Sequence, residues 1–136
     1  MPNQMINIMF KDTKTFSSFS VNDVQKAKDF YSNTLGLDVT QMPEMGDILD
    51  IALAGGYHVI AYPKPNHTPA TFTILNFSVT DVEKAVTDLK AKGVVFESYD
   101  SEYLKTDEDN IARGGGPLIA WFKDPAGNIL SVMQDK

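Results

Sequence analysis

Residues 19–27 read Phe19-Ser20-Val21-Asn22-Asp23-Val24-Gln25-Lys26-Ala27, and residues 77–85 read Phe77-Ser78-Val79-Thr80-Asp81-Val82-Glu83-Lys84-Ala85. Seven of these nine positions are identical at an offset of 58 residues. A match at one fixed offset indicates two copies of a structural unit of roughly sixty residues. Two copies are too few for a solenoid, so we predict a pair of related modules. A cleft between paired modules is a natural place for a ligand.

The composition is that of one globular domain, which we expect to span residues 1–136. Hydrophobic residues make up 43% of the chain and charged residues 22%, enough apolar material to form a core without covalent cross-links. The chain has no cysteine, which excludes disulfides, thiolate metal sites and cysteine nucleophiles.

The net charge and the hydropathy pattern indicate which partners and which cellular location to expect. A net charge of −6 disfavours nucleic acid, because phosphate-binding surfaces need clustered Lys and Arg. We find no apolar run of the roughly 18 residues that a membrane span requires, and the first residues lack the pattern of a signal peptide. We therefore expect a cytoplasmic protein whose partner is a small molecule, with no nucleic acid and no membrane involved.

Each copy of the repeat predicts a strand followed by a helix. Its first residues alternate between apolar and polar, which is typical of a half-buried strand. The aspartate in its middle can cap a helix, and a glycine just past the predicted helix end suits the left-handed C-cap. The corresponding pairs are Phe19 and Phe77 in the strands, Asp23 and Asp81 at the caps, and Gly36 and Gly93 at the helix ends.

Three extended segments follow each predicted helix, so that each copy reads βαβββ. They span residues 37–41, 48–54 and 57–62 in the first copy, and 94–98, 117–122 and 128–133 in the second. We expect tight hairpins at Gly55-Gly56 and at Asp124–Gly127. The modules are predicted as residues 12–62 and 71–134, and the proline-rich stretch 63–70 between them is the linker.

These features together resemble the glyoxalase, bleomycin-resistance and extradiol-dioxygenase superfamily, also called vicinal oxygen chelate proteins. The resemblance rests on the duplication, on Phe30-Tyr31 followed by Leu35-Gly36-Leu37, and on Asp124-Pro125-Ala126-Gly127-Asn128 near the end. It implies an α+β fold in which two tandem βαβββ modules form a curved mixed sheet around a cleft, with the helices on the outer face. It also implies a homodimer, because members commonly pair modules across chains.

The resemblance further implies a metal site on the concave face, and here the sequence departs from the family. Enzymatic members place His, Gln or Glu on the first and last strands of each module. Alignment on the repeat puts Phe16 and Ile74 at the two first-strand positions, and alignment on the terminal hairpins puts Ala61 and Ser131 at the other two. A divalent ion needs several converging imidazole, carboxylate or carbonyl donors. We therefore predict no metal and no cofactor.

Strand alternation predicts what lines the cleft instead. Side chains two residues apart share a face, and the assumed tight hairpins place Asp50 across from Ala61 and Phe122 across from Ile129. The result is an aromatic and aliphatic lining with a few polar groups, suited to a planar organic ligand. Packing into the core remains the alternative for the aromatic members, and an exposed edge position remains the alternative for Asp50. The predicted lining is Phe16, Ser18, Asp50, Tyr57, Ala61, Phe72, Ile74, Asn76, Phe122, Ser131 and Met133.

The remaining polar residues are assigned by position. His58 is predicted on the helix side or at the exposed end of its hairpin, and His67 lies in the linker, so neither is expected in a site. The acidic segment 97–117 is interpreted as a mobile flap beside the cavity or as a solvated loop. Arg113 within it is a candidate clamp for a ligand carboxylate. Trp121 is assigned mainly to the core.

Two functions of different class follow. The first is a protein that binds an aromatic or cationic small molecule in an apolar cleft without a metal, similar to the bleomycin-resistance branch. The second is a glyoxalase-type lyase or dioxygenase, which would need unusual metal ligands such as Asp50, His58 or Glu97. The missing ligands and the apolar lining favour the binding protein.

Overall fold

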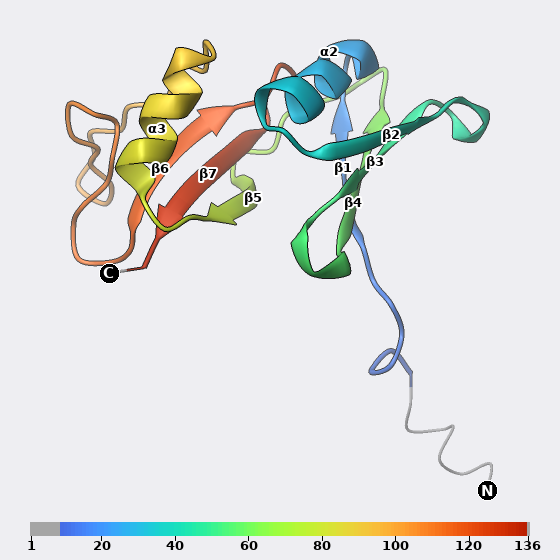
Figure 1. The fold of residues 1–136 in the computed structure, drawn as a ribbon, viewed down its shortest axis with the longest axis horizontal. Helices are drawn as coiled ribbons and strands as arrows, with labels where there is room; N and C mark the ends of the chain where they lie inside the picture. Colours follow the sequence, from blue (N-terminus) through green and yellow to red (C-terminus); the bar gives the residue numbers. More distant parts are fainter. Residues whose placement is uncertain (1–8, 136) are drawn as a thin grey trace, which may run out of the picture.

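The computed structural model describes residues 9–135, and these form an α+β fold with two separate sheets (Figure 1). The first sheet has the strand order β1-β4-β3-β2, in which β1 and β4 are parallel and the other pairs antiparallel. Its strands are β1 (Ser17–Val21), β2 (Asp38–Met42), β3 (Ile48–Ala52) and β4 (His58–Pro63). Helix α2 (Val24–Asp29) and a π-helical turn (Phe30–Thr34) connect β1 to β2, and 3-10 turns (Pro43–Met45 and Ala54–Gly56) precede β3 and β4.

The second module has three assigned strands where the sequence predicts four. They are β5 (Thr73–Ser78), β6 (Leu118–Lys123) and β7 (Ile129–Gln134), in the order β5-β7-β6, with α3 (Val82–Ala91) after β5. The predicted strand over residues 94–98 is reduced to a single bridge between Phe96 and Phe122. Val94 and Phe96 are buried, so the segment still packs beside β6 without a continuous ladder.

The repeated motif forms the two helix starts as predicted. The side chain of Asp23 accepts a hydrogen bond from the backbone N–H of Lys26 at 3.1 Å, and Asp81 accepts one from Lys84 at 3.0 Å. Helix α2 lies over the first sheet and beside the second module, and α3 lies against the second sheet (Figure 1). Both helices therefore cover the apolar face of their sheets.

Each terminal hairpin has a pairing register one residue away from the predicted one. Asp50 pairs with Ile60 and not with Ala61, and in the second module Phe122 pairs with Leu130. In the first module the turn is a 3-10 turn closed by a hydrogen bond from the N–H of Leu53 to the carbonyl of Tyr57, longer than the two-residue turn expected at the glycines. A shift of one residue moves the side chains of a strand to the other face of the sheet.

Polar contacts join the two modules at the turn between β6 and β7. Tyr31 donates its hydroxyl hydrogen to Asp124 Oδ2 at 2.7 Å, and both side chains are buried. Asn128 Nδ2 donates to the backbone carbonyl of Ser20 at 2.9 Å. The linker residue His67 lies within 2.6 Å of Ser20 Oγ and within 2.9 Å of the carbonyl oxygen of Ala126. The modules are thus held together by hydrogen bonds as well as by a shared apolar core.

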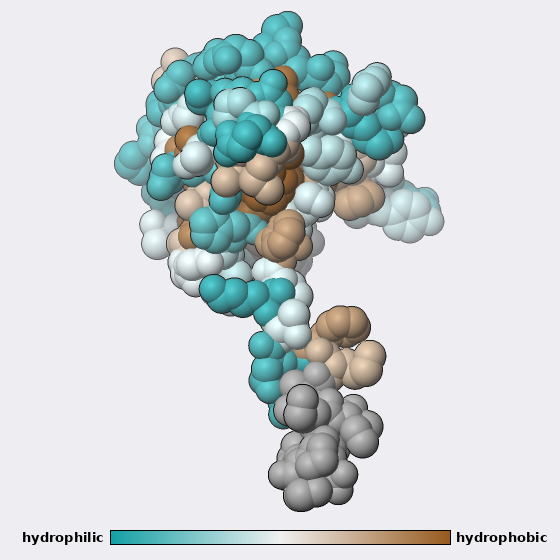
Figure 2. All heavy atoms as spheres, turned by 90° about the vertical axis from the view of Figure 1, so that its right-hand side faces the viewer, coloured by the Kyte–Doolittle hydropathy of each residue, from teal (hydrophilic) through white to brown (hydrophobic). Residues whose placement is uncertain are grey.

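Residues 9–16, ahead of β1, extend away from the body of the molecule (Figure 1). Met9 and Phe10 in this segment are 72% and 73% exposed, and hydrophobic atoms stand out on it in the space-filling view (Figure 2). Within residues 9–135 no helix has the length and apolar character needed to cross a membrane.

Candidate functional site

The open face of the first sheet differs from the predicted one in strand β4, which places Ile60 and His58 on it in place of Ala61. Because Ser18 and Asp50 both pair with Ile60, and Ala52 pairs with His58, these side chains share the face turned away from the core. The other face has an apolar centre that packs under the helix. Its members are Phe19, Val21, Leu49, Ile51, Val59 and Ala61.

His58 and Asp50 form a hydrogen-bonded pair on this open face, with 2.7 Å between His58 Nδ1 and Asp50 Oδ1. The side chains remain 49% and 29% exposed, so the pair is accessible to a ligand. An ionised carboxylate can only accept, which places a hydrogen on Nδ1. The other ring nitrogen, Nε2, is then left to act as an acceptor in the neutral ring or as a donor in the protonated ring.

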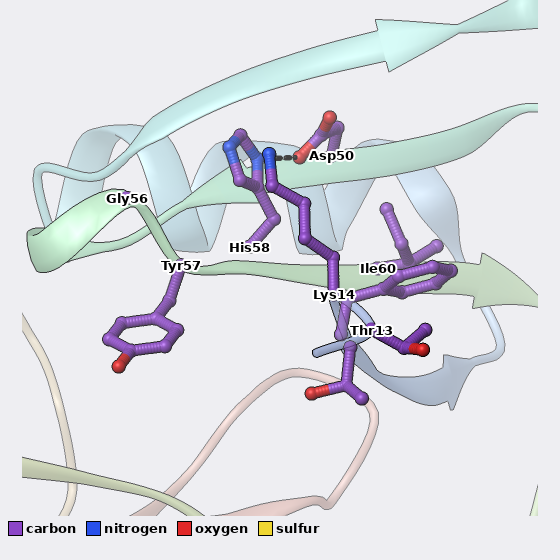
Figure 3. A pocket seen from close by; sticks show the side chains of 9 residues that line it. Thr13, Lys14, Asp50, Gly56, Tyr57, His58 and Ile60 are labelled. Atoms are coloured by element: carbon purple, nitrogen blue, oxygen red, sulfur yellow. Dashed lines mark hydrogen bonds and ion pairs between the residues drawn. The ribbon is translucent and has the colours of Figure 1, made fainter. Parts of the chain in front are cut away.

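This pair borders an open cavity of about 580 Å³ (Figure 3). Four elements line it: the segment ahead of β1, strand β3, the glycine turn and strand β4. Phe16 and Tyr57 are aromatic walls with exposed fractions of 70% and 69%. The complete lining is Thr13, Lys14, Thr15, Phe16, Asp50, Gly56, Tyr57, His58 and Ile60.

The corresponding face of the second sheet is closed by its own contacts. Ser131 Oγ donates to Asn76 Oδ1 at 2.6 Å, and Ser131 has no exposed surface. Trp121 shares this face because it pairs with Ser131, and its indole N–H donates to Thr73 Oγ1 at 3.2 Å. Trp121 also meets the ring of Tyr99 edge to face at 5.4 Å. The polar groups here are bonded to one another.

The residues predicted from the sequence to line the cleft lie in several different places. Phe16, Asp50 and Tyr57 come together at the cavity, while Ser18 lies on the same sheet face without lining it. Asn76, Ser131 and Met133 lie on the open face of the second sheet, Ile74 packs against the core, and Phe72 is 68% exposed.

Two predicted lining residues are corrected by the hairpin register. Ala61 and Phe122 have no exposed surface and belong to the core. Phe122 packs against Phe30 and Phe96, with ring centroids 6.3 and 5.3 Å apart. The same register places His58 and Ile60 in the cavity. His58 was predicted on the helix side or at the exposed end of its hairpin, and not in a site, and Lys14 and Ile60 were not predicted as lining residues. The alternation in residues 58–62 could have predicted this register. His58 and Tyr62 fall on one face of the strand, and the small apolar residues Val59 and Ala61 fall on the other.

Arg113 lies outside this cavity, in the loop that joins α3 to β6, and this loop lies beside α3 (Figure 1). Its Nε donates to Asp107 Oδ2 at 2.6 Å, and its Nη2 donates to Glu83 Oε2 on α3 at 2.7 Å. The hydrogen bond from Arg113, followed by one from the backbone N–H of Ile111, holds the pKa of Asp107 below its usual value. Ile111 is 1% exposed and anchors the loop in the core. The acidic segment is therefore tied to α3 and does not form a flap beside this cavity.

The side chains present do not fit the metal site that the fold suggests. Phe16 and Ile74 offer no donor atom, Ala61 faces the helix, and the hydroxyl of Ser131 is engaged by Asn76. Residues 9–135 contain no group of three or more His, Asp or Glu side chains arranged to hold a metal ion. Asp50 and His58 are adjacent, but Glu97, the third unusual ligand considered, pairs with Lys123 at 3.4 Å in the second module.

Comparison with known proteins places this geometry in context. None of the curated proteins gives a significant match to the chain. The solved structure of TnmS3, an antibiotic binding protein from Streptomyces sp. CB03234, is 24% identical, with a TM-score of 0.63 over 92% of this chain and 98% of that one. The fosfomycin resistance protein FosX from Listeria monocytogenes is 14% identical, with a TM-score of 0.67 over 92% and 94%.

A third structure, a glyoxalase/bleomycin resistance protein from Streptomyces sp. CB03234, is 26% identical, with a TM-score of 0.59 over 88% of this chain and 100% of that one. These likenesses extend over nearly the full length of each protein. The family model of the Glyoxalase/Bleomycin resistance protein/Dioxygenase superfamily matches residues 15–132, which include both modules and the cavity residues from Thr15 onward. The chain therefore belongs to the Glyoxalase/Bleomycin resistance protein/Dioxygenase superfamily.

Proposed function

We propose that the protein binds an aromatic small molecule in the cavity of the first module without a metal. The observation that carries this proposal is the pair of exposed aromatic side chains, Phe16 and Tyr57, at one cavity of about 580 Å³. That volume is within the usual range for small-molecule sites. Aromatic rings that stay exposed in the free protein gain contact area when a flat ligand packs against them. The donor set described above, which lacks converging metal ligands, supports a mode of binding that uses protein groups alone.

The aromatic part of the predicted ligand class is better supported than the cationic part. Asp50 was the expected partner for a ligand amine, and it already bonds to His58. A cationic ligand would have to share the Asp50 carboxylate with His58. We therefore retain the aromatic ligand as the proposed class.

We also propose that the working form is a homodimer. Met9, Phe10, Phe16, Tyr57 and Phe72 are all at least 68% exposed, an unusual number of large apolar side chains for a monomer of this size. A second copy of the chain covering the open sheet face would bury Phe16 and Tyr57 and would close the cavity. Light scattering coupled to size exclusion tests this directly, and a monomer at micromolar concentration contradicts it.

Titration calorimetry with a neutral flat probe tests the binding function. The probe is 4-nitroanisole, titrated in the presence of EDTA and, separately, after loading with Zn, Ni, Mn or Fe(II). We expect binding that the chelator does not change. Phe16→Ala and Tyr57→Ala should each lower the affinity about tenfold, because an aromatic contact contributes roughly 0.5–1.5 kcal/mol beyond buried area. Phe72→Ala is the matched control, since Phe72 is equally exposed but lies outside the cavity.

Three outcomes would overturn the proposal. Absence of binding by the wild-type protein under all these conditions removes the aromatic site. Binding that requires one of the metals restores the lyase or dioxygenase as the leading function. Equal losses in Phe16→Ala and Phe72→Ala would show that the probe binds elsewhere.

A further inference from the structure

The cavity contains a polar subsite that the binding of a flat apolar molecule does not use. Its centre is His58, whose Nδ1 is bonded to Asp50 at 2.7 Å. Among residues 9–135, Nε2 of the same ring makes no hydrogen bond. The ring is therefore oriented by one partner while its second nitrogen remains available, which is the arrangement of a group that meets a ligand.

The charges at this cavity favour an oxygen acid over an amine. Lys14, Asp50 and His58 are the lining residues that can carry charge. The negative charge of Asp50 is directed at His58, and Lys14 has no ion-pair partner among the described residues. The subsite is thus neutral when His58 is neutral and carries one positive charge when His58 is protonated.

The net negative charge of the protein favours a cationic ligand, but it acts over a longer range than the groups in the cavity. A net charge of −6 attracts cations to the surface in general. Salt screens such long-range effects beyond about 8–10 Å at physiological ionic strength. Groups in direct contact with the ligand therefore decide its class, and an ammonium group here would lie near Lys14 and would compete with His58 for Asp50.

We propose that His58, positioned by Asp50 and assisted by Lys14, binds the ionisable hydroxyl of a planar conjugated ligand, that is, a phenol or an enol. The proposal rests on the proposed function, because Phe16 and Tyr57 hold the flat part of the same molecule. His58 Nε2 accepts a hydrogen bond from the neutral hydroxyl. Alternatively the proton moves from the ligand oxygen to Nε2, and the resulting oxyanion accepts a hydrogen bond from the imidazolium and faces the Lys14 ammonium. No bond other than this O–H is broken.

The test compares 4-nitrophenol with 4-nitroanisole, which has the same ring but a methyl group in place of the acidic hydrogen. Affinities are measured by calorimetry with EDTA present. The bound state of 4-nitrophenol is read from its absorbance, because the phenolate absorbs in the visible range, at a pH where the free probe is mostly protonated. We expect 4-nitrophenol to bind about 10- to 100-fold more tightly, the ratio for one hydrogen bond involving a charged group. We also expect a phenolate spectrum on binding.

Substitutions in the subsite test whether its residues cause the tighter binding of 4-nitrophenol. His58→Gln and Lys14→Met should each lower the affinity for 4-nitrophenol toward that of 4-nitroanisole and should reduce the phenolate absorbance. Asp50→Asn tests positioning and should weaken the phenolate signal while His58 remains present. Lys105→Met is the matched control for loss of one positive charge, because Lys105 lies in the second module and is 77% exposed. Circular dichroism and melting temperature establish that each variant is folded.

The outcomes separate this inference from the binding function. Equal affinity for both probes with a protonated bound spectrum overturns the subsite and leaves the aromatic site standing. If neither probe binds, both proposals fail. Tighter binding of 4-nitrobenzylammonium than of 4-nitrophenol also overturns the subsite, because it would place a cation beside Asp50. Should His58→Gln fail to fold, the wild-type spectrum and Asp50→Asn still decide the matter.

Discussion

Replacement of Tyr31 by Phe removes one hydrogen bond at the contact between the modules and leaves the ring in place. The Tyr31 hydroxyl donates to Asp124 Oδ2 at 2.7 Å, and its loss leaves that carboxylate with three donors: the backbone N–H groups of Ala126 and Asn128, and the Asn128 side chain. A hydrogen bond to a charged group contributes about 1.5–3 kcal/mol, so Tyr31→Phe should lower the free energy of unfolding by about 2 kcal/mol. For a chain of 136 residues this corresponds to a fall in melting temperature of about 7 °C.

The effect should also depend on pH in a specific direction. Burial, and then the neighbouring Asp124 carboxylate, raise the pKa of Tyr31 far above its ordinary value. Above a pH of about 10 the unfolded chain loses this proton while the folded protein keeps it, so the unfolded state binds fewer protons and stability falls as pH rises. The wild-type protein loses up to about 1.4 kcal/mol per pH unit from this residue. Tyr31→Phe has no such group to ionise, so the difference in the free energy of unfolding between wild type and variant should become smaller above pH 10.

Urea denaturation at pH 7 and at several values above 10 measures both effects. Tyr103→Phe is the control, because Tyr103 is 90% exposed and its hydroxyl loss should change stability by less than about 0.5 kcal/mol. A Tyr31→Phe variant as stable as wild type at pH 7 would refute the reasoning. So would a deficit that stays constant across the alkaline range, since it would mean that Tyr31 ionises equally in both states.

Three further results are expected. In urea denaturation, Phe122→Ala should lower the free energy of unfolding by about 3–5 kcal/mol, because it leaves a cavity at a fully buried position. Phe16→Ala should change the free energy of unfolding by less than about 0.5 kcal/mol, because Phe16 is exposed. Similar losses in both variants would contradict the observed register. Arg113→Gln should speed amide hydrogen exchange in residues 107–113 with little change in melting temperature, and unchanged exchange would show that the ion pairs do not hold this loop. The lowered pKa of Asp107 means that its contribution is present above the ordinary value of about 3.9 and is lost as pH falls below it. The protection factors of the amides in this loop, which correct for the slower intrinsic exchange in acid, should therefore fall with pH more in the wild-type protein than in Arg113→Gln.

The duplication, the helix starts and the superfamily could be read from the sequence because each rests on local signals. Asp23 and Asp81 cap their helices through contacts only three residues long, and Gly36 and Gly93 adopt positive φ where the helix ends require it. Such short-range patterns do not depend on how distant segments pair.

The hairpin registers could not be read in the same way. Gly55 and Gly56 both have positive φ, which suits a two-residue turn as well as the longer turn observed. The choice between them is made by packing: Val59 and Ala61 fit beneath the helix, and His58 does not. Because the turn is longer than predicted, Ile60 and not Ala61 lies on the open face, and His58 lies beside Asp50. The local sequence therefore does not predict the polar subsite.

The second module differs from prediction for a related reason. Apolar residues at 94 and 96 alternate as in a strand, and both are buried. The acidic loop after them turns back at Asp107 and is anchored through Ile111 and Arg113, which draws the chain toward α3. Only one bridge to β6 forms, and a contact between residues 83 and 113 has no signal in the local sequence.

We expect the contacts at the turn between β6 and β7 to make the two copies unfold as a single cooperative unit. Asp124 is buried beside a side chain from the first copy, and Asn128 reaches a backbone carbonyl of that copy. If the first copy opened alone, it would expose these groups and leave Asp124 without Tyr31. Native-state hydrogen exchange should then report one global opening energy for the protected amides of β1 and of β7 alike. The two repeats are therefore expected to unfold together. The corresponding turn in the first copy, Ala54-Gly55-Gly56, contains no carboxylate and could not make the same contact.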